Sequence, residues 1–507
     1  MIETEERLET IEVVKRNGRK VEFDGTKVAL AIKKGFDNVL IGEDEKKYNE
    51  KDIQKVYQAV IKKIAKDFLP LGKIKIEDVQ DLIEENLKKY HYDDVYESFS
   101  EYRKRRMAAR VAFRDDKNMA KLQKSIEGLG LKSAIEEDSK RENANIDGNS
   151  AMGTMLQFGS TISRAFTETY LMKKKFAEAH DNGDIHIHDM DFEAMGTTTC
   201  MQIDLNKLFK GGFSTGHGHL REPQDIMSYS ALAAIAIQSN QNDQHGGQSI
   251  PAFDYYMAPG VLKTFKRQYK QAIYELLDYS DFISFVNMDK IEKEIDKLTS
   301  INVNTDMFAP IYKDSVEVKR IFDKAYETAY KKTDRATYQA MEAFVHNLNT
   351  MHSRAGAQVP FSSINFGTDT SPEGRMVMKN YLLSIDAGLG KNETPIFPIS
   401  IFKIRKGTNY DPEDPNYDLF KLSCKVSAKR LFPNFSFMDS SFNKPFYKGD
   451  YNTEVGYMGC RTRVMANVVD EDKAVTPGRG NLSFTSINLP RLGIKHGIVR
   501  NDETDLK

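Results

Sequence analysis

The spacing of apolar residues divides the first hundred positions into a hairpin and three helices. Apolar residues at 11, 13 and 14 precede Asn17-Gly18, and Val21 and Phe23 follow it. Asn-Gly favours a type I′ turn, because both central residues of that turn need φ > 0, so a β-hairpin is predicted over 12–23. Stripes at i, i+3, i+4 and i+7 predict helices around 53–64, 79–87 and 93–109. Residues 1–105 are therefore expected to form a hairpin packed on a small helical bundle.

The pattern changes beyond this bundle. The segment 107–142 is rich in charge and helical in character, which predicts a connector between domains. From 143 onward Gly, Pro and Asn punctuate shorter segments, and helical runs over 162–180, 262–298 and 334–350 alternate with short apolar runs such as 396–404 and 482–489. This mixture predicts a large α/β domain. We expect three parts: residues 1–106, a helical connector over 107–142, and the large domain over 143–507.

Composition is that of an ordinary globular protein. The chain has 507 residues, 40% hydrophobic and 29% charged, with a formal charge of −1. This balance indicates no nucleic-acid partner, although clefts for small phosphates remain open. No apolar run approaches the roughly 18–20 residues that cross a bilayer, and the acidic N-terminus lacks a signal-peptide core. We therefore expect a cytoplasmic protein without membrane contact.

The chain contains three cysteines, Cys200, Cys424 and Cys460. Three cysteines cannot form a disulfide framework, and no C-x-x-C pair is present for zinc. Each is therefore either a buried small apolar residue or a reactive thiol.

Basic residues flank the predicted hairpin turn. Lys15, Arg16 and Lys27 could converge on a triphosphate, with exposed backbone N–H groups assisting. Alternatively they belong to a solvated turn, where cations are common. The sequence contains no G-x-x-x-x-G-K-[ST] segment, so a P-loop is not predicted.

A second polar pattern is Asp184-Ile185-His186-Ile187-His188-Asp189. On a strand, side chains alternate with period 2, so both imidazoles would lie on one face. That spacing suits either a metal ion or packed, hydrogen-bonded histidines. No metal is assigned on this motif alone.

The hairpin segment, Val-x-Lys-Arg-Asn-Gly followed by Phe-Asp and Lys, resembles the ATP-cone, the regulatory nucleotide module of ribonucleotide reductases, over 10–106. The resemblance implies ATP and dATP as allosteric effectors that bind through Lys15, Arg16 and Lys27. The same module occurs in a zinc-ribbon transcription repressor. That alternative requires four zinc cysteines ahead of the cone, and the sequence has none there.

Several segments of the large domain resemble the anaerobic (class III) ribonucleoside-triphosphate reductases. They include Thr197-Thr198-Thr199-Cys200, Gln244-His245-Gly246-Gly247, Ser353-Arg354-Ala355-Gly356, Tyr457-Met458-Gly459-Cys460 and Gly478-Arg479-Gly480-Asn481. The resemblance implies an α/β fold of glycyl-radical-enzyme type: a ten-stranded barrel, here partial, with a finger loop at its centre.

The same resemblance implies site residues. Cys460 at the fingertip becomes a thiyl radical and abstracts the 3′ hydrogen, while Cys200 supplies reducing equivalents at the 2′ face. Asn481 positions substrate, and Met458 with Asn481 fits the branch that uses formate as reductant. His186, His188 and Asp189 are expected to line or support a nucleotide pocket. Cys424 matches no catalytic position and is predicted to be a core residue.

The expected partners also come from the resemblance: ribonucleoside triphosphates, deoxynucleotide effectors, a second copy of the chain, and a radical-SAM activating enzyme. The family's Arg-x-Cys-Gly-Tyr glycyl-radical segment and its four-cysteine zinc site are absent from these residues. We therefore expect an incomplete reductase that is inactive alone. Two alternatives stay open: a regulatory nucleotide-binding fragment without turnover, and an enzyme of the pyruvate formate-lyase type, which has no ATP-cone and usually shows adjacent cysteines.

Overall fold

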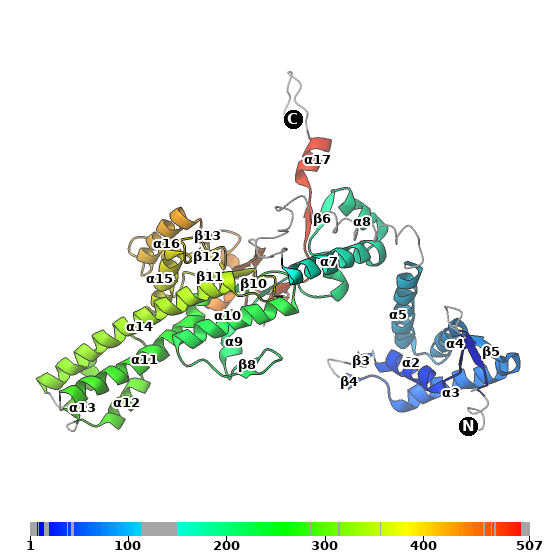
Figure 1. The fold of residues 1–507 in the computed structure, drawn as a ribbon, viewed down its shortest axis with the longest axis horizontal. Helices are drawn as coiled ribbons and strands as arrows, with labels where there is room; N and C mark the ends of the chain where they lie inside the picture. The colour runs from blue at the N-terminus through cyan, green and yellow to red at the C-terminus, as the bar shows by residue number, and fades with distance from the viewer. Residues whose placement is uncertain are drawn as a thin grey trace, which may run out of the picture. The chain divides into compact units, whose positions relative to one another are not determined.

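The computed structural model divides the chain into two compact units, 1–121 and 122–507 (Figure 1). It describes residues 8–112 and 150–497, apart from 9, 15–19, 38, 42–44, 281, 284–285, 313–314, 355, 460–461, 468 and 471–472.

The N-terminal unit is a three-stranded sheet packed against four helices. Strand β1 (Glu12–Val14) pairs antiparallel with β2 (Lys20–Glu22) and parallel with β5 (Lys73–Lys75). The helices are α2 (Gly25–Asp37), α3 (Glu50–Asp67), α4 (Ile76–Lys89) and α5 (Asp93–Ala112), and a short pair, β3 (Leu40–Ile41) and β4 (Glu45–Lys46), follows α2. The predicted hairpin and all three predicted helices are confirmed, although the tip of the hairpin lies outside the described residues.

Apolar stripes and charge pairs explain why these helices form. Val56, Val60 and Ile64 of α3 are fully buried, as the predicted stripe requires. Asn49 caps this helix, since its Oδ1 accepts the Lys51 N–H at 2.9 Å. Arg103 of α5 lies close to three carboxylates on one face of α4, which adds charge pairing to the apolar packing.

The C-terminal unit is built on a six-stranded sheet with the order β13-β12-β11-β10-β7-β16. Five strands run parallel: β7 (Cys200–Gln202), β10 (Gln248–Ile250), β11 (Ser362–Phe366), β12 (Ile399–Ile404) and β13 (Asn434–Phe437). The edge strand β16 (Gly480–Asn481) pairs antiparallel with β7. Crossover helices between parallel strands confirm the predicted α/β domain.

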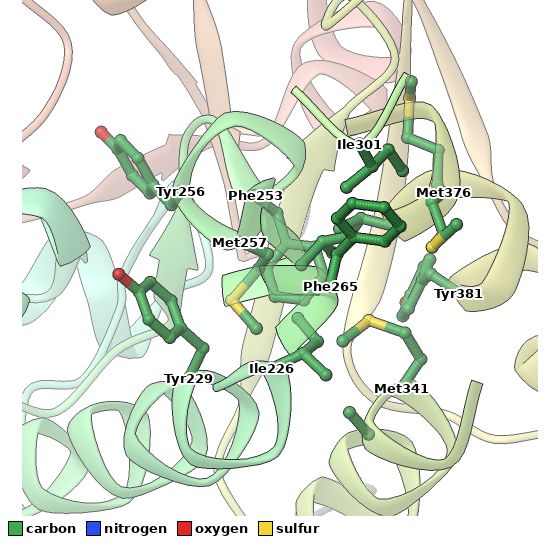
Figure 2. Close-up of a cluster of buried hydrophobic side chains, with 14 of the residues drawn as sticks. Ile226, Tyr229, Phe253, Tyr256, Met257, Phe265, Ile301, Met341, Met376 and Tyr381 are labelled. Carbon is green, nitrogen blue, oxygen red and sulfur yellow. The ribbon is translucent and has the colours of Figure 1, made fainter. Parts of the chain in front are cut away.

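The crossover helices are α10 (Ile226–Asp243), α11 (Phe253–Tyr279), α14 (Val316–Thr350), α15 (Pro372–Ala387) and α16 (Tyr417–Arg430). They share one apolar core with the side chains of Ile364, Phe366 and Phe402 from the sheet. Figure 2 shows part of this core, where Phe253 and Met257 of α11 lie among residues of α10, α14 and α15. Beyond the sheet, α11 and α14 continue side by side, with α12 (Met288–Asp296) and α13 (Ala309–Tyr312) near their far ends (Figure 1).

The opposite face of the sheet carries a hairpin, β14 (Gly456–Met458) and β15 (Thr462–Val464). Strand β14 contacts β7, β10 and β11. At the edge of the unit lie α7 (Ala151–Phe166), α8 (Lys174–Asp181), the antiparallel pair β6 (Ile185–Ile187) and β17 (Thr485–Ile487), and α17 (Leu489–His496). Smaller elements are α9 (Leu205–Phe209) and the pair β8 (Phe213–Ser214) and β9 (His219–Leu220). None of the helices in the described residues is long and apolar enough to cross a membrane.

Candidate active site

Cys200 and Asn481 lie directly opposite each other on β7 and β16. The Thr199 N–H donates to the Asn481 carbonyl at 2.9 Å. Residues paired directly across antiparallel strands project to the same face, so the Asn481 side chain shares the face of the Cys200 thiol. Two residues that the sequence analysis selected are therefore neighbours in the fold.

A glycine pair lies against the Cys200 thiol. The Gly247 N–H donates to Cys200 Sγ at 3.2 Å. A Cβ at Gly246 would fall 1.3 Å from the Thr199 carbonyl oxygen and 2.7 Å from Cys200 Sγ. Only a residue without a side chain fits there, so the Gln244-His245-Gly246-Gly247 segment holds its backbone in contact with the thiol.

The turn of the β14–β15 hairpin reaches the same point. A Cβ at Gly247 would lie 2.9 Å from Gly459 Cα, and a Cβ at Gly459 would lie 3.7 Å from Cys200 Sγ. Met458, just before this turn, is fully buried. Cys460 follows Gly459 directly but lies outside the described residues, so its contact with Cys200 stays a prediction.

The base of the hairpin is held by buried charges. The side chains of Lys403 and Glu454 are each 1% exposed, and Lys403 Nζ lies 3.0 Å from Glu454 Oε2. Arg405 Nη1 donates to Glu454 Oε1 at 2.7 Å, and Thr368 Oγ1 donates to Oε2 at 2.9 Å. Lys403 also donates to a backbone carbonyl at 2.8 Å. A buried hydrogen-bonded network of this kind fixes the segment that enters the hairpin.

His186, His188 and Asp189 line a pocket of about 370 Å³ beside this site. The ring centroids of the two histidines are 4.5 Å apart, so both side chains lie on one side of the chain, as the period-2 spacing predicts. His188 Nε2 lies 2.8 Å from Ser486 Oγ on β17. Burial, and then the neighbouring His186, lower the pKa of His188, which favours the neutral imidazole. Among the described residues no group of three His, Cys, Asp or Glu side chains could hold a metal ion.

Two residues that line the pocket, Asp189 and His245, connect it to the segments around the thiol. Thr199, which precedes Cys200, donates to Asp189 Oδ2 at 3.3 Å. His245, which precedes the glycine pair, has its Nδ1 2.6 Å from Thr197 Oγ1 and lines the pocket with Asp189. Burial lowers the pKa of His245. The pocket and the thiol are therefore joined through the segment Thr197–Cys200.

Arg354 closes another side of this pocket. Its Nη2 donates to the carbonyls of Gln241 and Gln244, at 2.8 and 2.5 Å, and its guanidinium lies 5.0 Å above the Phe192 ring. His245 and Arg354 lie in segments that resemble the reductase family, but no role for either residue was predicted from the sequence. The sequence offered one signal for them: His245 directly precedes Gly246-Gly247, and Arg354 lies two residues before Gly356.

The N-terminal unit carries the other predicted site. Lys27 lies in the first turn of α2, with a side chain 78% exposed and its Nζ 2.9 Å from Asp24 Oδ2. Lys15 and Arg16 lie outside the described residues. Their convergence with Lys27 on a phosphate therefore stays a prediction.

Comparison with known families decides two of the alternatives. Residues 142–506 match the model for anaerobic ribonucleoside-triphosphate reductase, and residues 11–108 match the ATP cone domain. The chain belongs to the anaerobic ribonucleoside-triphosphate reductase family. This membership, together with the ATP cone, decides against the pyruvate formate-lyase type and against the repressor.

Three curated members of this reductase family illustrate the relationship. The chain is 27% identical to the Haemophilus influenzae anaerobic ribonucleoside-triphosphate reductase, over 95% of this chain and 59% of the relative. The Escherichia coli protein is 26% identical, over 96% and 59%, and that of Enterobacteria phage T4 is 27% identical, over 74% and 53%. The chain thus spans about three fifths of the length of the first of these relatives.

Solved structures of the reductase family are more distant. The anaerobic ribonucleotide reductase from Thermotoga maritima in complex with dATP and CTP aligns with a TM-score of 0.42 at 13% identity. The alignment covers 69% of this chain and 51% of that one.

One site prediction is wrong. Cys424 was expected in the core, but it is exposed on α16. The buried face of that helix carries Leu419, Ser423, Val426 and Arg430. This i, i+4, i+7, i+11 series leaves position 424 on the solvent side.

Proposed function

We propose that this chain carries the substrate site of an anaerobic ribonucleoside-triphosphate reductase. The observation that carries the proposal is the meeting of β7, β16, the glycine pair and the hairpin turn at the Cys200 thiol. Consecutive Cα atoms are about 3.8 Å apart, so the residue after Gly459 can reach the same small space. Cys460 and Cys200 would then face one ribose from two sides.

The chemistry explains why two sulfurs are needed. A glycyl radical, when present, supplies the one-electron oxidation of the Cys460 thiol. Cys460 would take the 3′ hydrogen atom of the ribose, and Cys200 would deliver reducing equivalents where the 2′ hydroxyl leaves as water. With formate as overall reductant, formate gives up its hydrogen and two electrons and leaves as carbon dioxide, and one added proton completes the water.

Other residues of the chain would bind and orient the nucleotide. Asn481 would donate to the ribose beside Cys200, and the buried Met458 would help to keep water from the reacting atoms. His186, His188 and Asp189 would line the nucleotide pocket, because they border a cavity and Asp189 accepts a hydrogen bond from Thr199, the residue before Cys200. In this arrangement the hairpin is the finger loop, and the six-stranded sheet is part of a ten-stranded barrel.

Control of turnover would come from the N-terminal unit. We expect ATP and dATP to bind there through Lys15, Arg16 and Lys27, and deoxynucleotide effectors to select the substrate. We also expect a homodimer. A radical-SAM enzyme would generate the radical on the glycine of an Arg-x-Cys-Gly-Tyr segment, which these 507 residues do not include. The cone is tested by calorimetric titration with ATP: Lys15→Ala plus Lys27→Ala should abolish binding, and unchanged affinity would remove the assignment.

The reductase proposal is tested by anaerobic turnover of CTP in a version of the protein that includes a glycyl-radical segment, with its activating enzyme and formate. Cys460→Ser and Cys200→Ser should each abolish deoxynucleotide formation. Cys424→Ser should turn over like the parent, because that thiol is exposed on a helix away from the sheet's hairpin face. Turnover retained in Cys460→Ser would contradict the proposal.

A further inference from the structure

A single amide side chain joins the sheet to the hairpin. Asn365 of β11 is fully buried. Its Oδ1 accepts the Tyr457 N–H at 2.8 Å, and its Nδ2 donates to the Tyr457 carbonyl at 2.8 Å. One carboxamide thus supplies the donor and the acceptor that a neighbouring strand would otherwise offer to a residue of β14.

Neighbouring groups fix the orientation of this amide. Asn365 Nδ2 also lies 3.2 Å from Ser249 Oγ and 3.1 Å from the Ile250 carbonyl oxygen. Ser249 Oγ donates to the same Tyr457 carbonyl at 2.7 Å. A carbonyl can only accept and a backbone N–H can only donate, so the amide has one workable orientation. Tyr457 is therefore held at a single height above the sheet.

The sheet itself does not need this asparagine. Along β11, Ile364 and Phe366 point into the helix-covered core, and Asn365 points to the opposite face. The backbone of β11 is already paired with β10 and β12. An apolar residue would suit a buried strand, but it would leave the Tyr457 N–H without its side-chain partner and the Tyr457 carbonyl with the Ser249 hydroxyl alone. The presence of an asparagine at this position is explained by its hydrogen bonds to the hairpin.

The anchored residue lies close to the hairpin turn. Tyr457 and Gly459 belong to the Tyr457-Met458-Gly459-Cys460 segment, so the anchor is three residues from the fingertip cysteine. At the turn, Gly459 meets Gly247 and the Cys200 thiol. Loss of the anchor would let β14 slide or lift relative to the sheet, and the turn would leave its contact with Cys200.

We propose that Asn365 is a positioning residue that sets the distance between the sulfurs of Cys460 and Cys200. Ser249 assists it through the shared Tyr457 carbonyl. The inference rests on the proposed function, because it takes these two thiols as the groups that must meet across one ribose. Asn365 acts through the backbone of Tyr457, to which it donates one hydrogen bond and from which it accepts another.

The test is the rate at which Cys200 and Cys460 form a disulfide in this chain. Diamide serves as the two-electron oxidant and takes up both thiol hydrogens, and peptide mass spectrometry identifies the linked pair. Asn365→Asp keeps the shape of the side chain and the acceptor for the Tyr457 N–H. It replaces the Nδ2 donor by a carboxylate oxygen, which repels the Tyr457 carbonyl oxygen. We expect the rate to fall about tenfold or more, as for a lost buried hydrogen bond. The rate of disulfide formation in Asn365→Leu should fall at least as far.

Two further variants separate positioning from general loss of stability. Asn380 of α15 is also a buried asparagine, 2% exposed, and it bonds to Met376 and Asp334 away from the hairpin. Asn380→Asp should lower the melting temperature without changing the disulfide rate of the folded protein. Ser249→Ala leaves Asn365 in place and removes one donor to Tyr457, so its rate should fall by a few-fold at most.

The outcomes are distinct. A fast disulfide in the parent that slows in the Asn365 and Ser249 variants but not in Asn380→Asp supports the inference. Parent-like rates in the folded Asn365 and Ser249 variants overturn the inference and leave the proposed function standing. No disulfide in the parent overturns both, because the two thiols would then not share a pocket.

Discussion

Cys200 and Asn481 are direct partners across β7 and β16, although most of the C-terminal unit separates them in sequence. Their pairing closes the edge of the sheet with a strand from late in the chain. It also places a thiol and a carboxamide side by side above the same face. The hairpin turn and the glycine pair meet at the thiol of Cys200. A site of this kind depends on long-range strand pairing, and its parts act only when the whole unit is folded.

Asn481→Ala should weaken ribonucleoside triphosphate binding while leaving the fold intact. The strands pair through the backbone, so removing the side chain spares the ladder and takes away the hydrogen bond that we propose it makes to the ribose. We expect a loss of about 1–2 kcal/mol, roughly five- to thirtyfold in affinity, measured by calorimetric titration with CTP. Leu482→Ala, at an adjacent residue that is 82% exposed, should bind like the parent. Equal CTP affinity of the parent, Asn481→Ala and Leu482→Ala would show that Asn481 does not bind the substrate.

Gly246→Ala should destabilise the C-terminal unit by about 3 kcal/mol, because a Cβ 1.3 Å from the Thr199 carbonyl oxygen forces β7 and the glycine pair apart. Gly390→Ala is the matched control, since a Cβ there meets nothing within 4 Å. Urea unfolding followed by circular dichroism measures both. Equal midpoints would show that the close approach at Gly246 is not tightly packed.

Lys403→Met should lower the free energy of unfolding by about 3–5 kcal/mol, because it leaves the buried Glu454 carboxylate without one of its partners. Exposed Lys406→Met, on the same stretch of chain, should stay within about 0.5 kcal/mol of the parent. The Lys403 variant should also show faster proteolysis near the hairpin, since Glu454 lies at its base. A change no larger than that of Lys406→Met would mean that Arg405 and Thr368 satisfy the carboxylate alone.

The contribution of Asp369 to stability should fall as pH rises from about 4 to about 7. Burial, and then the nearby Asp254, raise the pKa of Asp369 from its ordinary 3.8 to about 7. The folded protein therefore binds this proton more tightly than the unfolded chain, so the stabilisation is complete below pH 4 and is lost as the pH passes 7. The slope should reach at most about 1.4 kcal/mol per pH unit.

Asp369→Asn should flatten this pH dependence, because an amide does not titrate and still accepts the Ser371 N–H that Asp369 Oδ1 accepts at 2.9 Å. Chemical unfolding at a series of pH values measures the slope. An unchanged slope in Asp369→Asn would assign the effect to another group, with the buried Asp254, whose pKa is also raised, as the next to test.

Local sequence signals predicted local structure well. Asn17-Gly18 and the stripe of Val56, Val60 and Ile64 predicted the hairpin and α3 because both depend on neighbours in sequence. The run 334–350 predicted only half of α14, which begins at Val316. Its buried positions in the middle of the helix are Ala325, Ala329, Thr333 and Thr337, and such small or polar residues give a faint apolar stripe.

The site was predicted only in part. Cys200, Asn481 and Met458 came from family resemblance, and no periodicity indicates that β16 pairs with β7. The anchoring role of Asn365 was missed, because a buried asparagine on a central strand is explained only once its partner is known. Cys424 shows the reverse error: its exposure could have been inferred from the helical spacing of Leu419, Ser423 and Val426.

The measurement that tests the central claim most directly is protection of the cysteines from iodoacetamide by CTP, followed at each cysteine by peptide mass spectrometry. If Cys200 and Cys460 face one ribonucleotide pocket, CTP should slow alkylation of both together, with the same concentration dependence. The exposed Cys424 should react at an unchanged rate and serves as the internal reference. Protection of neither thiol at saturating CTP, or of one without the other, would contradict the shared substrate site.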